Sequence, residues 1–295
     1  MQSVKIGDYS VGRVTELQFA PFPALEFFPA ANPDMVEATR RALPGRITDD
    51  GKIVMSFHAF VLKTGRHTIM IDTCCGVDKP RPGREQFNVG KKDFIAGLAA
   101  VGVKPEEVTH VMCTHLHWDH VGWNTRRVDG RWVPTFPNAR YIMAKREYDY
   151  WDGVYAKEKG KTDNMHALGF EDSVLPLMRA EKAILVGDDY ELDKGLSLEP
   201  CHGHSPGHVV LNVASGGRNG VFIGDVIHHP IQLLFPDLST RADFDRDAAR
   251  VSRKALIDKH ADAGTIVLPQ HFATPSCGTI KRSGNAFGFD FIDGS

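Results

Sequence analysis

The sequence feature that most constrains this chain is a run with four potential metal ligands within six residues, Thr114-His115-Leu116-His117-Trp118-Asp119-His120. It directly follows a β-branched, apolar run at residues 108–113 that ends abruptly in polar residues. Such a run is typical of a buried strand that opens into a loop. Imidazoles two residues apart at a strand's end can point toward one centre, while the next Asp and His serve a second centre. We therefore predict a metal site, in preference to a surface loop that is merely rich in histidine.

The composition is that of a soluble globular protein: 295 residues, 42% hydrophobic and 24% charged, with a formal net charge of −2. This balance gives no reason to expect a nucleic acid or an anionic membrane as a partner. No apolar run approaches the roughly 18 residues that span a bilayer, and the N-terminal residues lack the apolar core of a signal peptide. The five cysteines form an odd, irregular set, which favours reduced thiols and a cytoplasmic location.

The apolar runs predict strands and helices throughout the chain, without a linker that would mark a domain boundary. Strand-rich regions followed by helical spacing occur twice, which favours two packed sheets with helices outside them. We therefore predict an α/β protein with a single domain spanning residues 1–295. Strands are expected at residues 4–18, 53–62, 67–72, 108–113, 132–137, 139–143, 183–186, 196–200, 209–214, 220–224 and, as the last strand, 265–268. Helices are expected at residues 35–43, 93–100, 145–180 and 245–261.

Residues 19–29 form an irregular segment that is rich in phenylalanine and proline. Proline cannot donate to a sheet, so this segment is not expected to be a central strand. It opens an insertion at about residues 19–50, for which the sequence leaves two interpretations open. The insertion is either a core or homodimer contact, or a lid over a pocket, since irregular insertions are often functional.

Further ligand-type residues occur where later apolar runs end, and a pair of metal ions needs them because the first cluster alone is incomplete. His204 lies within His202-Gly203-His204-Ser205-Pro206-Gly207-His208. Asp225 follows the run that ends at Gly224, and His271 follows the run at residues 266–268. Each of these residues alone is more often a cap or a surface residue. In this order after the first cluster, they support one another.

With these residues in this order, the chain resembles the metallo-β-lactamase superfamily of metallohydrolases, from about Phe57 to His271. The resemblance implies an αββα sandwich with the metal ions at one edge of the two sheets. It also implies how the ligands are divided between two metal ions. One ion would be bound by His115, His117 and His204, the second by Asp119, His120 and His271, and Asp225 would bridge them.

The same resemblance implies roles for residues beside the ligands. Asp72 matches the family's strand-end Asp, which is expected to orient the ligand imidazoles, as carboxylates behind metal-bound histidines do. His202 and His208 flank a ligand and are left out of the metal set, with His208 expected to be a structural hydrogen-bonding residue.

Within the superfamily, the full set of histidines without a cysteine in the bridging position resembles the lactonase and glyoxalase II side. The run from His115 to Asn124 is similar to the quorum-quenching N-acyl-homoserine lactonases and the organophosphate hydrolases related to them. One position departs from that pattern. Those lactonases carry a Tyr three residues after the bridging Asp, where this chain has His228, beside His229. We predict that His228 donates a hydrogen bond to the substrate in place of the Tyr.

The expected cofactors are two divalent metal ions, with Zn²⁺ preferred and Fe or Mn left open because imidazole and carboxylate ligands suit all three. A metal-bound water of lowered pKa would attack the substrate, and Asp119 would carry a proton to the leaving group. This scheme fits lactones, related esters, cyclic amides, thioesters and phosphotriesters. Aromatic side chains are the expected pocket walls and favour a small, apolar or aromatic substrate: Phe22, Phe27, Phe28, Trp118, Trp123 and Phe235.

Two other classes of function remain as alternatives. The same scaffold hosts iron in persulfide dioxygenases and flavodiiron oxygen reductases, but no appended flavin or rhodanese-like domain is visible in this sequence. A non-catalytic binding protein would be expected to have a degenerate ligand set, and this set is intact. Nucleic-acid processing would bring a basic patch, which the sequence does not show. A metal-dependent, lactonase-like hydrolase is therefore the prediction.

Overall fold

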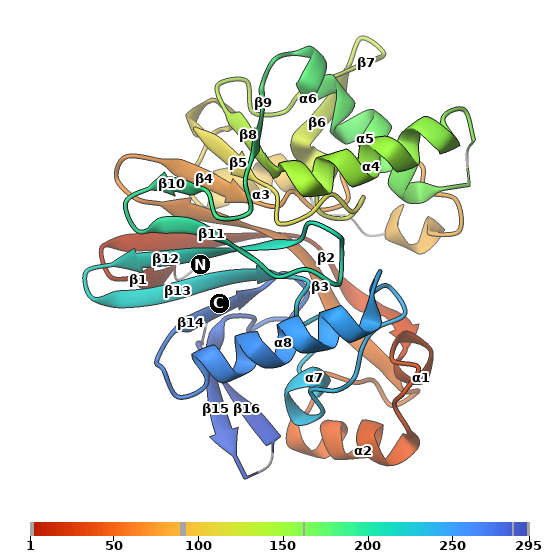
Figure 1. Cartoon of the computed structure of the whole chain (residues 1–295), viewed down its shortest axis with the longest axis vertical. Coiled ribbons are helices and arrows are strands. Elements are labelled where there is room, and N and C mark those ends of the chain that lie inside the picture. Colours follow the sequence, from red (N-terminus) through yellow and green to blue (C-terminus); the bar gives the residue numbers. More distant parts are fainter. Residues whose placement is uncertain (1–2, 89–92, 162, 285, 294–295) are drawn as a thin grey trace.

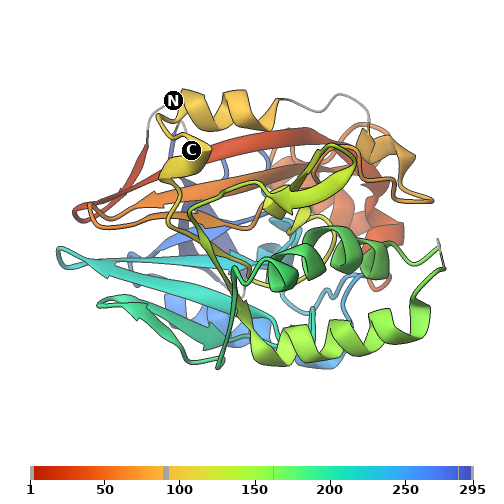
Figure 2. The same ribbon diagram turned by 90° about the horizontal axis from the view of Figure 1, so that it is seen from above.

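The computed structural model describes residues 3–88, 93–161, 163–284 and 286–293. Two sheets of seven strands lie face to face, and helices cover the outer face of each sheet (Figure 1). Figure 2 shows the same layers from above, with the two sheets stacked and helices along the outside. The αββα sandwich expected from the sequence is confirmed.

The first sheet combines an antiparallel half with a parallel half. Its first four strands pair antiparallel, and its last four are parallel to one another. Parallel neighbours need crossover connections, which the helices on the outer face supply. In spatial order the strands are β1 (Val4–Ile6), β2 (Tyr9–Pro23), β3 (Lys52–Lys63), β4 (Thr68–Ile71), β5 (His110–Met112), β8 (Arg140–Ala144) and β9 (Ala183–Val186).

The second sheet extends further than the sequence predicted. The expectation that the strand near residue 268 would be the last is wrong, because two more strands follow it and pair antiparallel. The first of them, at residues 278–283, is polar and gave only a weak strand pattern. The second, at residues 286–291, alternates Phe with Ala, Gly and Asp, a strand signal that the sequence analysis overlooked. In spatial order the strands are β10 (Glu191–Asp193), β11 (Leu196–Pro200), β12 (Val209–Ser215), β13 (Arg218–Gly224), β14 (Ile266–Pro269), β15 (Gly278–Ser283) and β16 (Ala286–Phe291). A separate hairpin, β6 (Thr125–Val128) and β7 (Arg131–Pro134), was predicted only in its second strand.

Two outer helical layers complete the sandwich (Figure 1). On the first sheet lie α3 (Phe94–Ala100), α4 (Lys145–Glu158), α5 (Met165–Ser173) and α6 (Leu175–Arg179). On the second lie α7 (Ile231–Leu234) and α8 (Arg246–His260). Helix α8 begins where the Asp245 side chain accepts hydrogen bonds from the N–H groups of Asp247 and Ala248, which satisfies two otherwise unpaired donors. Short 3₁₀ turns occur at Glu85–Asn88, Pro105–Glu107 and Gly122–Asn124.

The core follows from this layering, and β3 shows it most clearly. Phe60 and Leu62 face the second sheet, where the ring of Phe60 lies 5.4 Å from that of Phe222. Ala59 and Val61 face the helical layer instead. Because both faces of this strand are covered, its sequence is continuously apolar rather than alternating.

The proline-rich segment is the far end of β2, which continues to Pro23 along β3. Pairing shifts register between Phe19 and Phe22, and this irregularity accommodates Pro21, which has no N–H to donate. The chain then forms α1 (Ala24–Phe27) and the predicted helix, α2 (Pro33–Ala42), whose cap Asn32 accepts a 2.9 Å hydrogen bond from the Met35 N–H.

The parallel strand pairs determine where the functional residues meet. In the first sheet Ile71 of β4 aligns with Met112 of β5, so Asp72 and the histidine cluster leave the sheet at the same edge. In the second sheet Gly224 of β13 aligns with Pro269 of β14, so the residues that follow both strands also leave together. Within the described residues, no helix combines the length and apolarity needed to cross a membrane.

The loops after β4 and after the histidine cluster pack backbone to backbone at Gly122. The Gly122 N–H donates a 2.7 Å hydrogen bond to the carbonyl of Cys74, and the Trp123 N–H donates to Thr73 at 2.8 Å. A methyl group at Gly122 would lie 2.0 Å from the carbonyl carbon of Cys75. No side chain fits there without separating the two loops.

We predict that Gly122→Ala destabilises the protein by about 1–3 kcal/mol, the usual range for overpacking a buried site. Gly153→Ala is the matched control, because a methyl group there meets nothing within 4 Å. It lies within α4 and should be neutral or raise stability by about 0.5–1 kcal/mol. Denaturant unfolding of both variants checks this, and a Gly122→Ala midpoint at or above that of the original chain would contradict it.

Candidate metal centre

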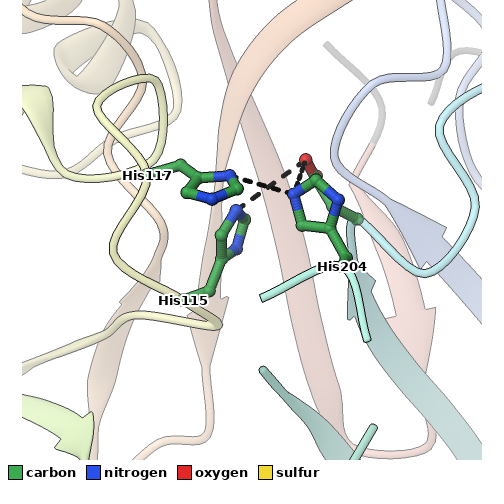
Figure 3. Close-up of side chains that lie close together, drawn as sticks. His115, His117 and His204 are labelled. Carbon is green, nitrogen blue, oxygen red and sulfur yellow. Dashed lines mark hydrogen bonds and ion pairs between the residues drawn. The ribbon is translucent and has the colours of Figure 1, made fainter. Parts of the chain in front are cut away.

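Three imidazoles and one carboxylate form a first buried group: His115, His117, His204 and Asp225. One ligand atom from each lies within 4.8 Å of all the others. Figure 3 shows the three imidazoles pointing toward one another, with His204 Nε2 3.0 Å from His117 Nδ1. His115 and His117 come from the loop after β5, while His204 comes from the loop between β11 and β12. The two sheets therefore contribute to one group.

A second group lies beside the first and contains Asp119, His120 and His271. The Nε2 atoms of His120 and His271 are 3.2 Å apart. Asp119 Oδ2 lies 3.9 Å from His120 Nε2 and 3.8 Å from His271 Nε2. This group again joins the loop after β5 to the end of the second sheet.

The carboxylate of Asp225 lies between the two groups. Its Oδ2 atom is 3.2 Å from His204 Nε2 and 3.8 Å from His115 Nε2. Its Oδ1 atom is 3.2 Å from the Nε2 atoms of both His120 and His271. Each oxygen thus faces a different set of imidazoles, which is the arrangement expected of a carboxylate shared by two cations.

The donor atoms fit divalent metal ions. Among the described residues, His115 Nε2 and Asp225 Oδ1 are buried without a hydrogen-bond partner. Buried polar atoms are normally paired, so unpaired ones that face a ligand-rich space indicate a binding site. Imidazole and carboxylate ligands suit Zn²⁺, Fe and Mn. The two groups of residues can therefore hold metal ions.

Asp72 holds one imidazole in place, as the resemblance implied. Its Oδ2 atom accepts hydrogen bonds from His120 Nδ1 at 2.9 Å, from Gln270 Nε2 at 2.9 Å and from the Thr114 hydroxyl at 2.8 Å. Its Oδ1 atom accepts the Thr114 N–H at 2.8 Å. A carboxylate that accepts the Nδ1–H fixes the ring so that His120 Nε2 is directed at the ligand space.

Two further supports escaped the sequence reasoning. His204 Nδ1 donates a 2.9 Å hydrogen bond to Asp243 Oδ1, and His271 Nδ1 donates to the carbonyl of Ser56 at 3.1 Å. Asp243 lies in a loop 39 residues beyond its partner, with no strand end or motif to mark it. A backbone carbonyl carries no sequence signal at all.

The pKa values at this site reflect a few buried carboxylates among many imidazoles. Burial lowers the pKa of His204, but the carboxylates of Asp225 and Asp243 outweigh it and raise this pKa to about 9. Burial also lowers the pKa of His120. The carboxylates of Asp225 and Asp72 outweigh this effect and raise the pKa well above its usual range. Burial would raise the pKa of Asp225, yet the surrounding imidazoles, His120 foremost, lower it well below its usual range. Metal ions would take the place of these protons.

The flanking histidines lie where the sequence placed them, outside the two groups. His208 Nε2 accepts the Asp225 backbone N–H at 3.1 Å, so His208 is a hydrogen-bonding residue that positions the shared carboxylate. His202 pairs with Asp188 at 2.9 Å. His228 is buried, not on an exposed loop, and its Nε2 atom lies 3.2 Å from Asp225 Oδ2.

The two groups lie at one side of a cavity of about 310 Å³. Of the predicted walls, Phe22, Phe27 and Trp118 line it. The other three do not, because packing directs them elsewhere. Phe28 is fully buried edge-on to Phe27, Trp123 stacks on Phe94, and Phe235 packs into the apolar cluster behind the wall. The walls that the sequence reasoning missed are Met55, Phe57, Arg84, Phe87, Met165, His166, Arg241 and Ala242.

A model of the Metallo-beta-lactamase superfamily matches residues 58–271. The chain belongs to this superfamily. The family and the fold expected from the histidine cluster are thereby confirmed, and the relatives and structures named below include hydrolases and lactonases, as expected for a metal-dependent hydrolase.

Among sequence relatives, an N-acyl homoserine lactonase of Bacillus cereus is 24% identical over 232 residues, which cover 74% of this chain and 81% of the relative. An N-acyl homoserine lactonase of Bacillus thuringiensis is 26% identical over 159 residues, or 54% of each chain.

Among solved structures, the hydrolase AbOPH of the beta lactamase superfamily has a TM-score of 0.82 at 24% identity, covering 99% of this chain and 97% of that one. The dizinc quorum-quenching lactonase AidC, in complex with a product, has a TM-score of 0.78 at 22% identity, covering 100% of this chain and 97% of that one. These likenesses show a shared fold over the whole length of the chain.

Proposed function

We propose that this protein is a dinuclear-metal hydrolase that opens a lactone or a closely related ester or cyclic amide. The observation that carries the proposal is the position of Asp225, whose two oxygens each face a different set of imidazoles. A carboxylate shared in this way supports two cations side by side. The relatives named as N-acyl homoserine lactonases support the lactone as the substrate class.

In this proposal His115, His117 and His204 would hold one ion, Asp119, His120 and His271 would hold the second, and Asp225 would bridge them. Zn²⁺ is the proposed metal, and the dizinc centre named for the structural neighbour AidC supports it. Fe and Mn suit the same ligands, so metal analysis of the purified protein distinguishes them. When bound, the pair of ions would supply a hydroxide nucleophile near neutral pH and a Lewis acid for the carbonyl.

Asp119 is placed to move a proton. Its side chain is 16% exposed and lines the cavity, while its Oδ2 atom lies 3.8 Å from His271 Nε2. The carboxylate therefore faces both the ligand space and the substrate space. We assign to this carboxylate the uptake of a proton from the attacking water and its delivery to the leaving alkoxide, through the oxygen that does not face His120 and His271.

His228 is placed to hold the substrate carbonyl. It lines the cavity, its Nε2 atom lies 3.2 Å from Asp225 Oδ2, and within the described part of the chain its Nδ1 atom has no hydrogen-bond partner. Its ring centre is 4.6 Å from that of His204 and 5.7 Å from that of His271. A ring N–H at this place can donate to the negative oxygen that develops as the carbonyl is attacked.

The cavity walls favour an apolar or aromatic small molecule. Phe57 and Phe87 meet edge to face at 5.0 Å, and Trp118 meets Phe87 in the same way at 5.0 Å. Phe22 and Phe27 stack at 5.2 Å on the insertion side, so residues of the insertion form part of the wall. An aromatic or acyl group packed against these rings would place an attached lactone at the metal centre.

We predict that the Zn²⁺-loaded protein hydrolyses lactones faster than thioesters, β-lactams and phosphotriesters carrying the same aromatic group. Asp225→Ala should abolish this activity, because one substitution removes a ligand from both ions. Asp237→Ala is the control, since Asp237 is an exposed residue paired with Lys254. Steady-state rates on the four substrates test the proposal. A thioester or phosphotriester hydrolysed faster than the lactone would contradict it, as would an iron-loaded protein that oxidises its substrate instead.

His228→Ala should lower kcat more than it raises KM, because the hydrogen bond forms mainly in the transition state. Loss of one well-aligned donor typically costs roughly 10²–10³ in rate, and less where a metal ion shares the charge. His228→Tyr should recover part of kcat, and His202→Ala serves as a control outside the cavity. Steady-state kcat and KM, measured together with the metal content of each variant, test this role of His228. A His228→Ala enzyme with a full complement of metal and a rate within about twofold of the original would rule out this role.

A further inference from the structure

Two arginines line the cavity and have no part in the proposed reaction. Arg84 precedes the 3₁₀ turn Glu85–Asn88, and Arg241 lies in the loop before α8. The rest of the cavity wall away from the metal centre is largely aromatic or apolar. Two cations in such a wall need an explanation, because an apolar substrate alone would gain nothing from them.

Arg84 is half-buried and lines the cavity. Its Nη1 atom donates a 2.8 Å hydrogen bond to the carbonyl of Gly83, and among the described residues no carboxylate forms an ion pair with it. Burial lowers the pKa of Arg84, and the positive charge of Arg241 lowers it further, against the attraction of Asp119 and Glu85. Because both arginines line the same cavity, their positive charges face one space.

Arg241 is fixed beside the aromatic wall. Its backbone N–H donates a 2.9 Å hydrogen bond to the carbonyl of Phe27, and its guanidinium carbon lies 4.8 Å from the centre of the Phe22 ring. Its Nη1 atom lies 3.8 Å from Glu26 Oε2, on a side chain that is 65% exposed. An ion pair so open to water offsets little of the charge that faces the cavity.

We infer that Arg84 and Arg241 together bind an anionic group of the substrate, such as a carboxylate carried on its aromatic or acyl body. This inference rests on the proposed function and narrows its substrate class. An anion between the two guanidinium groups would remove their repulsion and accept charge-assisted hydrogen bonds from both. The rings of Phe22, Phe27 and Phe87 would hold the apolar part of the same molecule.

The competing explanation is that the arginines only cover aromatic surface. Arg241 does lie over Phe22, and a guanidinium packed on a ring stabilises the wall whatever ligand is bound. That role predicts equal effects of substitution on charged and uncharged ligands. Anion binding predicts an effect on the charged ligand alone, which increased salt weakens.

The test compares two ligands that differ only in charge, 1-indanone-5-carboxylate and 1-indanone-5-carboxamide. Their ring ketone takes the place of a fused lactone and is not hydrolysed, so binding is measured apart from turnover. Titration calorimetry on the Zn²⁺-loaded protein should show tighter binding of the carboxylate by about tenfold or more, as expected for charge-assisted hydrogen bonds. Arg84→Gln and Arg241→Gln should each reduce this preference, and the double variant should bring the two ligands within about twofold.

Arg66→Gln is the matched control, because Arg66 is an exposed arginine outside the cavity, paired with Asp193, and should leave the preference unchanged. An absent preference in the original protein, or one that survives the double variant, would overturn the inference. In the second case the carboxylate binds elsewhere, for example at the metal ions. The lactone pair 5-carboxyphthalide and 5-carboxamidophthalide tests the proposed function separately. Failure to hydrolyse either one would count against a lactonase, while the binding ratio alone decides the role of the arginines.

Discussion

The structure depends on the burial of one carboxylate, that of Asp225, among imidazoles contributed by both sheets. A buried carboxylate is destabilising unless neighbouring charges and hydrogen bonds offset its loss of water. Here His120, His204 and His271 surround it at 3.2 Å, and the ring of His208 accepts its backbone N–H. That arrangement needs loops from two sheets to meet at one edge. The loops meet there because β4 ends level with β5 in the first sheet, and β13 ends level with β14 in the second.

The same edge explains why so many polar residues around the centre are buried. Asp72 ties the loop after β5 to the end of β14 through Thr114 and Gln270, and Gly122 allows the loops of the first sheet to pack closely. These contacts orient ligands before any ion binds, which lowers the cost of assembling a metal centre. Aromatic rings from β3 and from the insertion then close the other side of the cavity. In the proposed function, these aromatic walls select the substrate, and the metal-ligand residues at the edge of the sheets carry out the reaction.

The sequence was sufficient for features whose signal is local. A buried strand ending in His-x-His-x-Asp-His, followed by later strand ends with His or Asp, predicted the seven residues that form two neighbouring groups in the structure. It could not separate Phe27, which lines the cavity, from its neighbour Phe28, because the direction of α1 decides which ring faces inward. Asp243 and the cavity arginines were missed for a similar reason. They lie in loops without periodicity, and only the packing of distant segments makes them neighbours.

The central claim is that two metal ions lie on either side of Asp225. Anomalous scattering from crystals of the Zn²⁺-loaded protein, measured across the zinc absorption edge, tests it most directly. The account predicts two peaks, one among His115, His117 and His204 and one among Asp119, His120 and His271, each about 2.0–2.2 Å from an oxygen of Asp225. A single peak would contradict it. So would a second peak among His204, His228 and Asp243, which form a further group of ligand-type atoms within 4.8 Å of one another.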